Sequence, residues 1–381
     1  MGSISIASNS RKRAALDAAL IMAIGMGFGR FAFTAIYPHM VEERLLSLHG
    51  GSLAASANYA GYLLGAMLGR RVRAHTAHRL CLWAVGGTVG CLAVMALLDA
   101  TWAMVAARGI AGVFSALAMV AASLWLLEHR RHLHGAPLLY AGVGVGIALS
   151  AELLILGSHA GLQSKGLWLL LGVVSLIIGL VACRGLFASG NETVAEGTAL
   201  TSSVSASVKP VPLVVIYGLA GFGYIVTATY LPLLVKAALP DIDAAQVWAV
   251  FGLGAAPSCF LWHRIHQRLG TRWSLTANLT TQALGVALPV ISPSAAGYLL
   301  SALLVGGTFM GTVTIAMPAA QRIARHVRGN LLATMTVVYS IGQIVGPIVA
   351  NSLYARTHNF SSSLLTAAGA LMAAVFVSAS L

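Results

Sequence analysis

The chain consists almost entirely of apolar segments long enough to cross a lipid bilayer, and this pattern constrains its fold more than any other feature. The hydrocarbon core of a bilayer is about 30 Å thick, and a helix needs roughly 20 apolar residues to span it. Hydrophobic residues make up 58% of the 381 positions and charged residues only 9%, whereas soluble domains carry about 25% charged residues. The sequence therefore predicts an all-α membrane protein without a large aqueous domain.

Hydropathy predicts twelve transmembrane helices in two bundles of six. The expected spans are 15–38, 51–69, 79–98, 101–127, 136–157, 165–186, 211–236, 244–263, 272–291, 295–318, 331–354 and 361–380. The one long polar stretch, 187–209, is rich in Ser and Thr, which is typical of a flexible linker. We therefore expect a cytoplasmic N-terminal tail (1–13), a first bundle (14–186), a cytoplasmic linker (187–209) and a second bundle (210–381).

The distribution of the basic residues along the chain indicates the membrane topology. Most of the 23 Lys and Arg fall in alternate loops, as in the run Arg70, Arg71 and Arg73, and this asymmetry is the positive-inside pattern. It predicts a multi-pass protein of the cytoplasmic (inner) membrane with both termini in the cytoplasm. The net charge of +13 is then a topology signal, and we expect the lipid bilayer, not nucleic acid, as the partner.

Glycine and proline recur at matching positions in the two predicted bundles. Gly27, Gly29 and Pro38 in the first helix match Gly221, Gly223 and Pro232 in the seventh, and Gly142 and Gly146 in the fifth match Gly342 and Gly346 in the eleventh. Such matches indicate a 6+6 internal repeat. Small residues of this kind serve as close-packing and bending points in membrane helices, so we do not interpret the Gly-rich runs as dinucleotide fingerprints.

These features resemble the major facilitator superfamily over the whole chain. The first helix, from Gly25 to Pro38, and the segment from Asn58 to Gly65 are similar to its YbfB/YjiJ-like branch. The resemblance implies secondary transport through a central cavity, with gating or structural roles for residues that match its motifs or the repeat. These residues are Gly27, Gly29, Pro38, Gly65, Arg70, Gly112, Gly221, Gly223, Pro232, Gly346 and Pro347. The loop motif after the second helix lacks its acid, because Gly69 stands at that position.

Three formal charges interrupt the predicted spans: Arg30, Arg108 and Glu152. From a rise of 1.5 Å per residue, all three should lie roughly 8–12 Å below the outer surface, in one slab. Two guanidinium groups form a docking surface for a carboxylate or another oxyanion. Glu152 is the candidate for proton coupling, since burial and a nearby Arg change the pKa of a carboxyl in opposite directions.

Each of these residues has an alternative interpretation. Arg108 can be a helix-packing or snorkelling residue, Glu152 can reach water beyond its helix end, and Arg30 can be structural. Further candidates are uncharged residues that lie on the same helix face as Arg30 or at the equivalent position of the repeat. The expected substrate-binding residues are Arg30, Arg108, Thr34, Tyr37 and Tyr224. Asn58, Gln282 and Gln343 are expected to form interhelical hydrogen bonds or to line the cavity.

The leading hypothesis is a monomeric secondary active transporter that moves a small organic anion by alternating access and is coupled to protons. The alternative is a proton-driven efflux pump for hydrophobic or cationic drugs. A membrane enzyme would need clustered acids or histidines, a channel would need rings of like residues, and the sequence offers neither. No phosphate-binding loop or metal-ligand spacing is present in the sequence, so we expect no cofactor or metal. A sensor or scaffold built on a transporter fold stays a further alternative.

Overall fold

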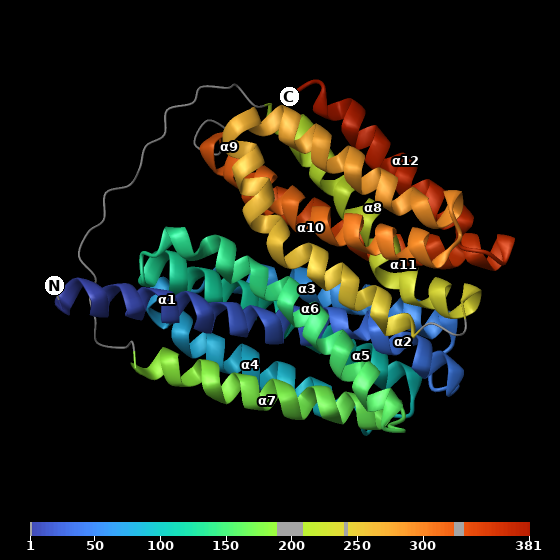
Figure 1. Ribbon diagram of the computed structural model, residues 1–381, viewed down its shortest axis with the longest axis horizontal. Helices are drawn as coiled ribbons and strands as arrows, with labels where there is room; N and C mark the ends of the chain where they lie inside the picture. The colour runs from blue at the N-terminus through green and yellow to red at the C-terminus, as the bar shows by residue number, and fades with distance from the viewer. Residues whose placement is uncertain (1, 189–208, 240–242, 324–330) are drawn as a thin grey trace.

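The computed structural model describes residues 2–188, 209–239, 243–323 and 331–381, and these form two helical bundles (Figure 1). The helices of the first bundle follow the expected spans, with α1, the π-helix η1 and α2 joined end to end as its first crossing. They are α1 (Gly2–Met22), η1 (Ala23–Phe31), α2 (Ala32–Glu42), α3 (Leu48–Gly69), α4 (Ala77–Met95), α5 (Thr101–Ser123), η3 (Leu124–His129), α6 (Ala136–His159) and α7 (Ser164–Ala188), with short turns η2 (Ala74–Thr76) and η4 (Leu133–Gly135). The expected linker lies almost wholly outside the described residues.

The second bundle is built from five helices in the chain order, of which one is bent. They are α8 (Pro210–Ala238), α9 (Ala244–Ile291), α10 (Ala295–Ile323), α11 (Leu331–Thr357) and α12 (Ser361–Ser378). α9 has 48 residues, and Gly270 within it has a φ of 73°. Because glycine lacks a Cβ, it adopts this left-handed conformation without steric cost. Gly270 therefore divides α9 into two arms, which correspond to the predicted spans 244–263 and 272–291.

The all-α membrane fold is confirmed. Within the described residues, ten helical stretches are long and apolar enough to cross a membrane. The count of twelve follows when α9 is taken as two crossings and the 22-residue helix α3, which is less apolar, is added. Helices are the element expected here, because each satisfies its own backbone hydrogen bonds in a medium without water.

Glycines bring corresponding helices of the two bundles into backbone contact. A Cβ on Gly27 of η1 would overlap the backbone of Gly146 on α6. In the second bundle a Cβ on Gly342 of α11 would lie 2.6 Å from the carbonyl oxygen of Gly218 on α8, and one on Gly221 2.6 Å from that of Tyr339. The repeated glycines thus occupy equivalent helix pairs, where larger side chains do not fit.

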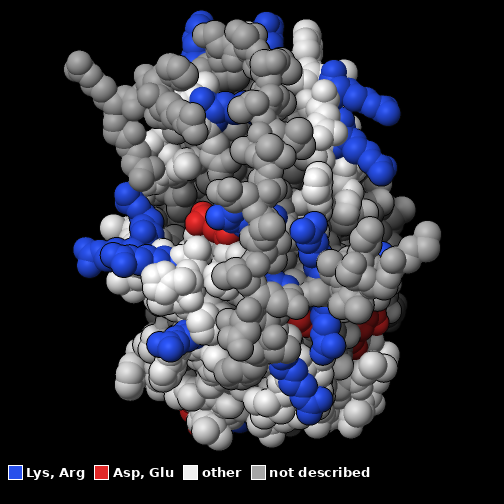
Figure 2. Space-filling view, turned by 90° about the vertical axis from the view of Figure 1, so that its left-hand side faces the viewer, with Lys and Arg blue, Asp and Glu red and all other residues white. Residues whose placement is uncertain are grey.

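Both termini lie at the end of the molecule where α7 ends and α8 begins, which we call the linker end (Figure 1). Figure 2 looks onto the linker end and shows Lys and Arg scattered across it with few Asp or Glu. Exposed examples from the described residues include Arg71, Arg79, Arg264, Arg268 and Arg272. This concentration of positive charge on one end of the bundle is the distribution that the positive-inside rule associates with the cytoplasmic side.

The two bundles meet at the opposite, distal end and spread apart toward the linker end (Figure 1). The distal contacts include hydrogen bonds from Ser56 Oγ to the carbonyl oxygen of Ile344 (3.0 Å) and between Ser52 Oγ and Tyr230 Oη (2.6 Å). Tyr230 Oη in turn donates to the carbonyl oxygen of Pro347 (2.9 Å). Among the described residues, the hydrogen bonds and ion pairs between the bundles run from the level of Arg30 to the distal end.

Candidate functional site

Arg30 lies at the centre of the molecule, where the two bundles meet, and only 3% of its surface is exposed. It is the last but one residue of the π-helix η1, a type of turn that is frequent at functional sites. Its guanidinium carbon lies 5.2 Å from the ring centroid of Phe31, 5.0 Å from that of Tyr59 and 4.0 Å from that of Tyr62. Three aromatic faces therefore surround the cation.

A polar chain connects Arg30 to the second bundle. Its Nη2 donates a hydrogen bond of 2.8 Å to Oε1 of Gln343 on α11. The side-chain amide of Gln343 donates in turn to the hydroxyl of Tyr224 on α8. The structure thus brings together two of the expected substrate-binding residues, Arg30 and Tyr224, which come from equivalent positions of the repeat. Gln343, expected to form an interhelical hydrogen bond or to line the cavity, is the link between them.

Arg108 of α5 is buried to the same degree but is used differently. Its Nη1 and Nη2 donate to the carbonyl oxygens of Gly29 and Arg30, both at 2.8 Å, and its guanidinium carbon lies 4.7 Å from the ring centroid of Phe33. These carbonyls lie at the end of the π-helical turn. Arg108 therefore ties α5 to the backbone of the first crossing, which favours the helix-packing alternative over a direct substrate contact.

Neither Arg30 nor Arg108 has a carboxylate partner among the described residues. The ion pairs of that part of the chain are Lys165 with Asp99 (2.6 Å) and Lys236 with Glu42 (3.1 Å), and both are partly exposed. A buried charge is costly unless it is paired, since its desolvation removes several kcal/mol. The centre of the protein is consequently positive, without a carboxylate counter-ion from the described residues.

Thr34 and Tyr37 extend from the same crossing toward the distal end. Thr34 Oγ1 donates to the carbonyl oxygen of Ala228 on α8 (2.9 Å), which joins the bundles. Tyr37 Oη donates to the carbonyl oxygen of Leu48 (2.8 Å), and its ring stacks on Phe33 at 5.2 Å. The structure gives both side chains packing roles near Arg30, and neither contacts its guanidinium. Their contact with substrate stays a prediction.

Glu152 does not join the two arginines in this structure. It is exposed on α6, on the same helix face as the exposed Val145, Leu149 and Leu156. The depth of a residue along a helix can be counted from the sequence, but the direction of its side chain around the helix depends on the neighbours. The structure does not bring the side chain of Glu152 to Arg30 and Arg108, and its role in proton coupling stays a prediction.

A different acid, which is not among the three intramembrane charges of the sequence analysis, is buried. Asp17 on α1 is 5% exposed and is the one buried acid among the described residues. A Cβ on Gly185 of α7 would overlap its carboxylate, so the absence of a side chain at that position makes room for it. Asp17 lies within the first turn of the first predicted span (15–38), and this position was the sequence signal for a buried acid.

The remaining gating and structural candidates divide by position. A Cβ on Gly65 or Gly112 would overlap backbone across the contact of α3 with α5, and Cβ atoms on Gly29, Gly223 and Gly346 would meet side chains of Thr88, Leu371 and Ile225. Pro38, Pro232 and Pro347 lie inside α2, α8 and α11. Arg70 follows α3 and is exposed at the linker end.

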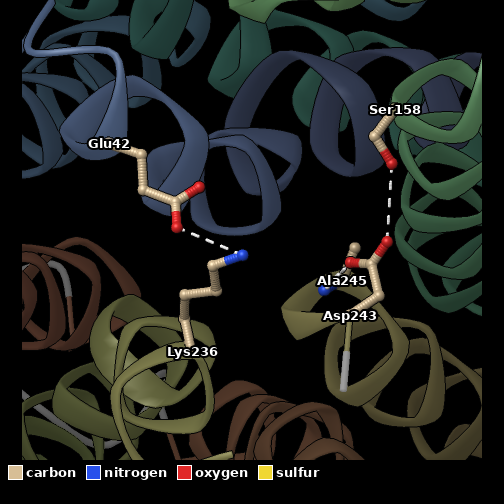
Figure 3. A network of polar contacts seen from close by, with 5 residues as sticks. All are labelled: Glu42, Ser158, Lys236, Asp243 and Ala245. Carbon is tan, nitrogen blue, oxygen red and sulfur yellow. Dashed lines mark hydrogen bonds and ion pairs between the residues drawn. The ribbon is translucent and has the colours of Figure 1, made fainter. Parts of the chain in front are cut away.

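At the distal end, polar side chains hold the bundles together (Figure 3). Glu42 Oε1 lies 3.1 Å from Lys236 Nζ, and Ser158 Oγ donates to Asp243 Oδ2 at 3.5 Å. The other oxygen of Asp243 accepts the backbone N–H of Ala245 (2.9 Å). We call these residues the distal latch. They surround a cavity of about 240 Å³ whose lining residues are Pro38, His39, Glu42, Ser158, Lys236, Asp243 and Ala244.

One comparison with known proteins identifies the family, and a second identifies the fold. A sequence model described as "Uncharacterised MFS-type transporter YbfB" matches residues 22–379. The structure is similar to a crystal structure of the nucleoside transporter NupG, with a TM-score of 0.70 and 13% identity over 96% of this chain and 99% of that chain. At this identity the likeness shows the shared fold alone. No curated protein matches the sequence.

Proposed function

The chain belongs to the YbfB-type transporters of the major facilitator superfamily, and we propose that it moves a small organic anion across the cytoplasmic membrane. The family consists of secondary transporters and not of enzymes. The proposed site is the central one around Arg30, where the two bundles meet. Transport would follow the alternating-access scheme, in which two bundles rock about a site near the middle of the bilayer.

The uncompensated positive charge at the centre is the observation that supports an anion. Arg30 and Arg108 are 3% and 2% exposed, and among the described residues no carboxylate pairs with either. A guanidinium keeps its charge at every physiological pH, so a bound anion can provide the neutralisation that no described carboxylate provides. An anionic substrate supplies that neutralisation, and Arg30 offers the contact because its present partner, Gln343, is a neutral amide.

The runner-up, an efflux pump for hydrophobic or cationic drugs, has weaker support from the same geometry. Aromatic cages attract cations through the negative faces of their rings. Here the faces of Phe31, Tyr59 and Tyr62 are already directed at the guanidinium of Arg30. A second cation would meet the like charge of Arg30, whereas an anion would be attracted by it.

The distal latch supports a conformation that is closed on one side. If the linker end is cytoplasmic, as its basic residues suggest, the polar contacts close the periplasmic side and the bundles part toward the cytoplasm (Figures 1 and 2). We propose this inward-facing assignment with both termini in the cytoplasm. Uptake with protons and efflux against them would use the same parts.

Proton coupling needs a carboxyl group that changes its charge during transport. Glu152 stays the candidate from the sequence, and the structure adds Asp17, which is buried beside Gly185. We propose to separate them by measuring transport-linked proton flux in liposomes for Asp17→Asn and Glu152→Gln. Loss of flux with retained anion binding in one variant identifies the coupling carboxyl. Wild-type flux in both variants would contradict proton coupling through either.

The test of the proposed function is thermal stabilisation of the detergent-purified protein by a ligand panel. The panel contains carboxylates, sulfonates, sugars, nucleosides and cationic drugs, and a ligand that prefers the folded state raises the melting temperature by mass action. We expect carboxylates to stabilise the wild type and Arg70→Gln, which changes an exposed arginine. Arg30→Gln should lose the response. Stabilisation by cations or nucleosides that persists in Arg30→Gln would overturn the anion proposal.

A further inference from the structure

Aromatic rings from both bundles are concentrated beside Arg30. Phe31, Tyr59 and Tyr62 of the first bundle lie around its guanidinium. On the second bundle, Tyr224 stacks on Phe309 with ring centroids 5.4 Å apart and planes inclined by 18°. Aromatic residues make up only 7% of the chain, so composition alone does not lead to this concentration at one point of the interface.

The rings of the two bundles touch each other across the interface. The ring centroid of Phe31 lies 6.3 Å from that of Trp248 and 5.8 Å from that of Phe309, both on the second bundle. Trp248 also stacks on Phe251 at 4.4 Å. A movement of the bundles that separates these faces would turn them into the flat walls of a slot. Arg30 lies at its edge, next to Phe31 in the chain.

The polar contacts of Arg30 define what kind of anion can bind. The N–H groups of its Nε and Nη2 point in parallel and form an edge that a carboxylate can bind with both oxygens. Gln343 Oε1 occupies the Nη2 position, while the buried Nε has no hydrogen-bond partner in the described part of the chain. Both terminal nitrogens of Arg108 are held by backbone carbonyls. The Nε of Arg108 also lacks a partner in the described part of the chain, but the Nη2 beside it is held by a backbone carbonyl. Only on Arg30 would release of a side chain, Gln343, free an Nε–Nη2 edge for one carboxylate.

We infer that the substrate is an aromatic monocarboxylate. Its carboxylate binds the Nε–Nη2 edge of Arg30 in place of Gln343, and its ring enters between Phe31 and the Tyr224–Phe309 stack. A dicarboxylate would place its second charge among rings without a second free cation. This inference rests on the proposed function and goes beyond it by naming the chemical class of the organic anion.

The experiment compares two acids that differ in the π face and match in charge and approximate size. Dissociation constants of benzoate and cyclohexanecarboxylate are measured by titration calorimetry on the detergent-purified full chain, with succinate as the dicarboxylate. One ring-stacking pair favours benzoate by about threefold to tenfold in affinity, and succinate should bind more weakly than either. Equal affinity for benzoate and cyclohexanecarboxylate, or tighter binding of succinate, would overturn the inference.

Ring variants locate the preference. Phe309→Leu should reduce the ratio of the two affinities to about one, while Phe376→Leu, which changes a ring that is 74% exposed, should leave it unchanged. Trp248→Leu serves the same purpose if Phe309→Leu does not fold. If the ratio of the benzoate and cyclohexanecarboxylate affinities is unchanged in the central ring variants, the proposed slot is refuted. A protein that binds carboxylates without preferring rings retains the proposed function, whereas one that binds no carboxylate loses both.

Discussion

The two central arginines, Arg30 and Arg108, should respond differently to mutation. Arg108 is engaged by the backbone and Arg30 by a single neutral side chain. We predict that Arg108→Gln destabilises the protein but retains the response to carboxylates. Arg30→Gln should lose that response, and its loss of the contacts with Gln343 and three rings is offset in part because the substitution removes a buried charge that no described carboxylate pairs with.

The cost of Arg108→Gln follows from its contacts. Interhelical hydrogen bonds in membranes contribute about 0.6 kcal/mol on average and up to about 1.7 kcal/mol, and Arg108 makes two of them, to Gly29 and Arg30. Its stacking on Phe33 adds about 0.5–2 kcal/mol. The sum is about 2–5 kcal/mol, which corresponds to a lower melting temperature on the order of 5 °C.

The assay is thermal unfolding of both variants in one detergent, with and without saturating carboxylate. Arg108→Lys is the matched control, because its ammonium keeps the charge but cannot span two carbonyls as a planar fork does. It should fall between wild type and Arg108→Gln. An Arg108→Gln protein that melts with the wild type, or that loses the carboxylate response while Arg30→Gln keeps it, would refute the division of roles.

Two further predictions concern packing and the distal latch. Gly27→Ala should lower stability by about 1–3 kcal/mol, because its Cβ would overlap the backbone of Gly146, whereas Gly86→Ala, with no atom near its Cβ, should be neutral or stabilising in the same melting assay. Lys236→Gln breaks the ion pair with Glu42. It should leave melting nearly unchanged yet raise hydrogen exchange at the distal helix ends by up to about fivefold, the ratio that corresponds to 1 kcal/mol. Unchanged exchange would show that the ion pair does not hold the bundles together.

The sequence predicts the crossings well because hydropathy is a local property of the chain. It places a break between 244–263 and 272–291, and the structure makes that break at Gly270 alone. It also finds Arg30 and Arg108, since a charge in an apolar run is visible without any knowledge of packing. The position of each charge along its helix follows directly from counting residues.

The direction in which a side chain points around its helix, and the contacts between distant segments, are not local properties of the chain. The sequence alone does not predict them. Glu152 is exposed while Asp17, which the sequence analysis does not single out, is buried, because α6 turns the Glu152 face outward while Gly185 of α7 leaves room for the Asp17 carboxylate. The ring cluster joins Phe31 with Trp248 and Phe309, residues more than two hundred positions apart. No periodicity in a single sequence reports such a meeting.

The hydrogen bond between Arg30 and Gln343 gives the proposed site a direct link to the movement of the bundles. It joins the first bundle to the second at the level of the substrate, and a carboxylate on Arg30 would replace it. A ligand shifts a conformational equilibrium only by its difference in affinity for the two states. Because binding here would exchange a contact between the bundles for a contact with substrate, that difference arises at the site itself, and occupancy of Arg30 favours the state in which Gln343 has been released.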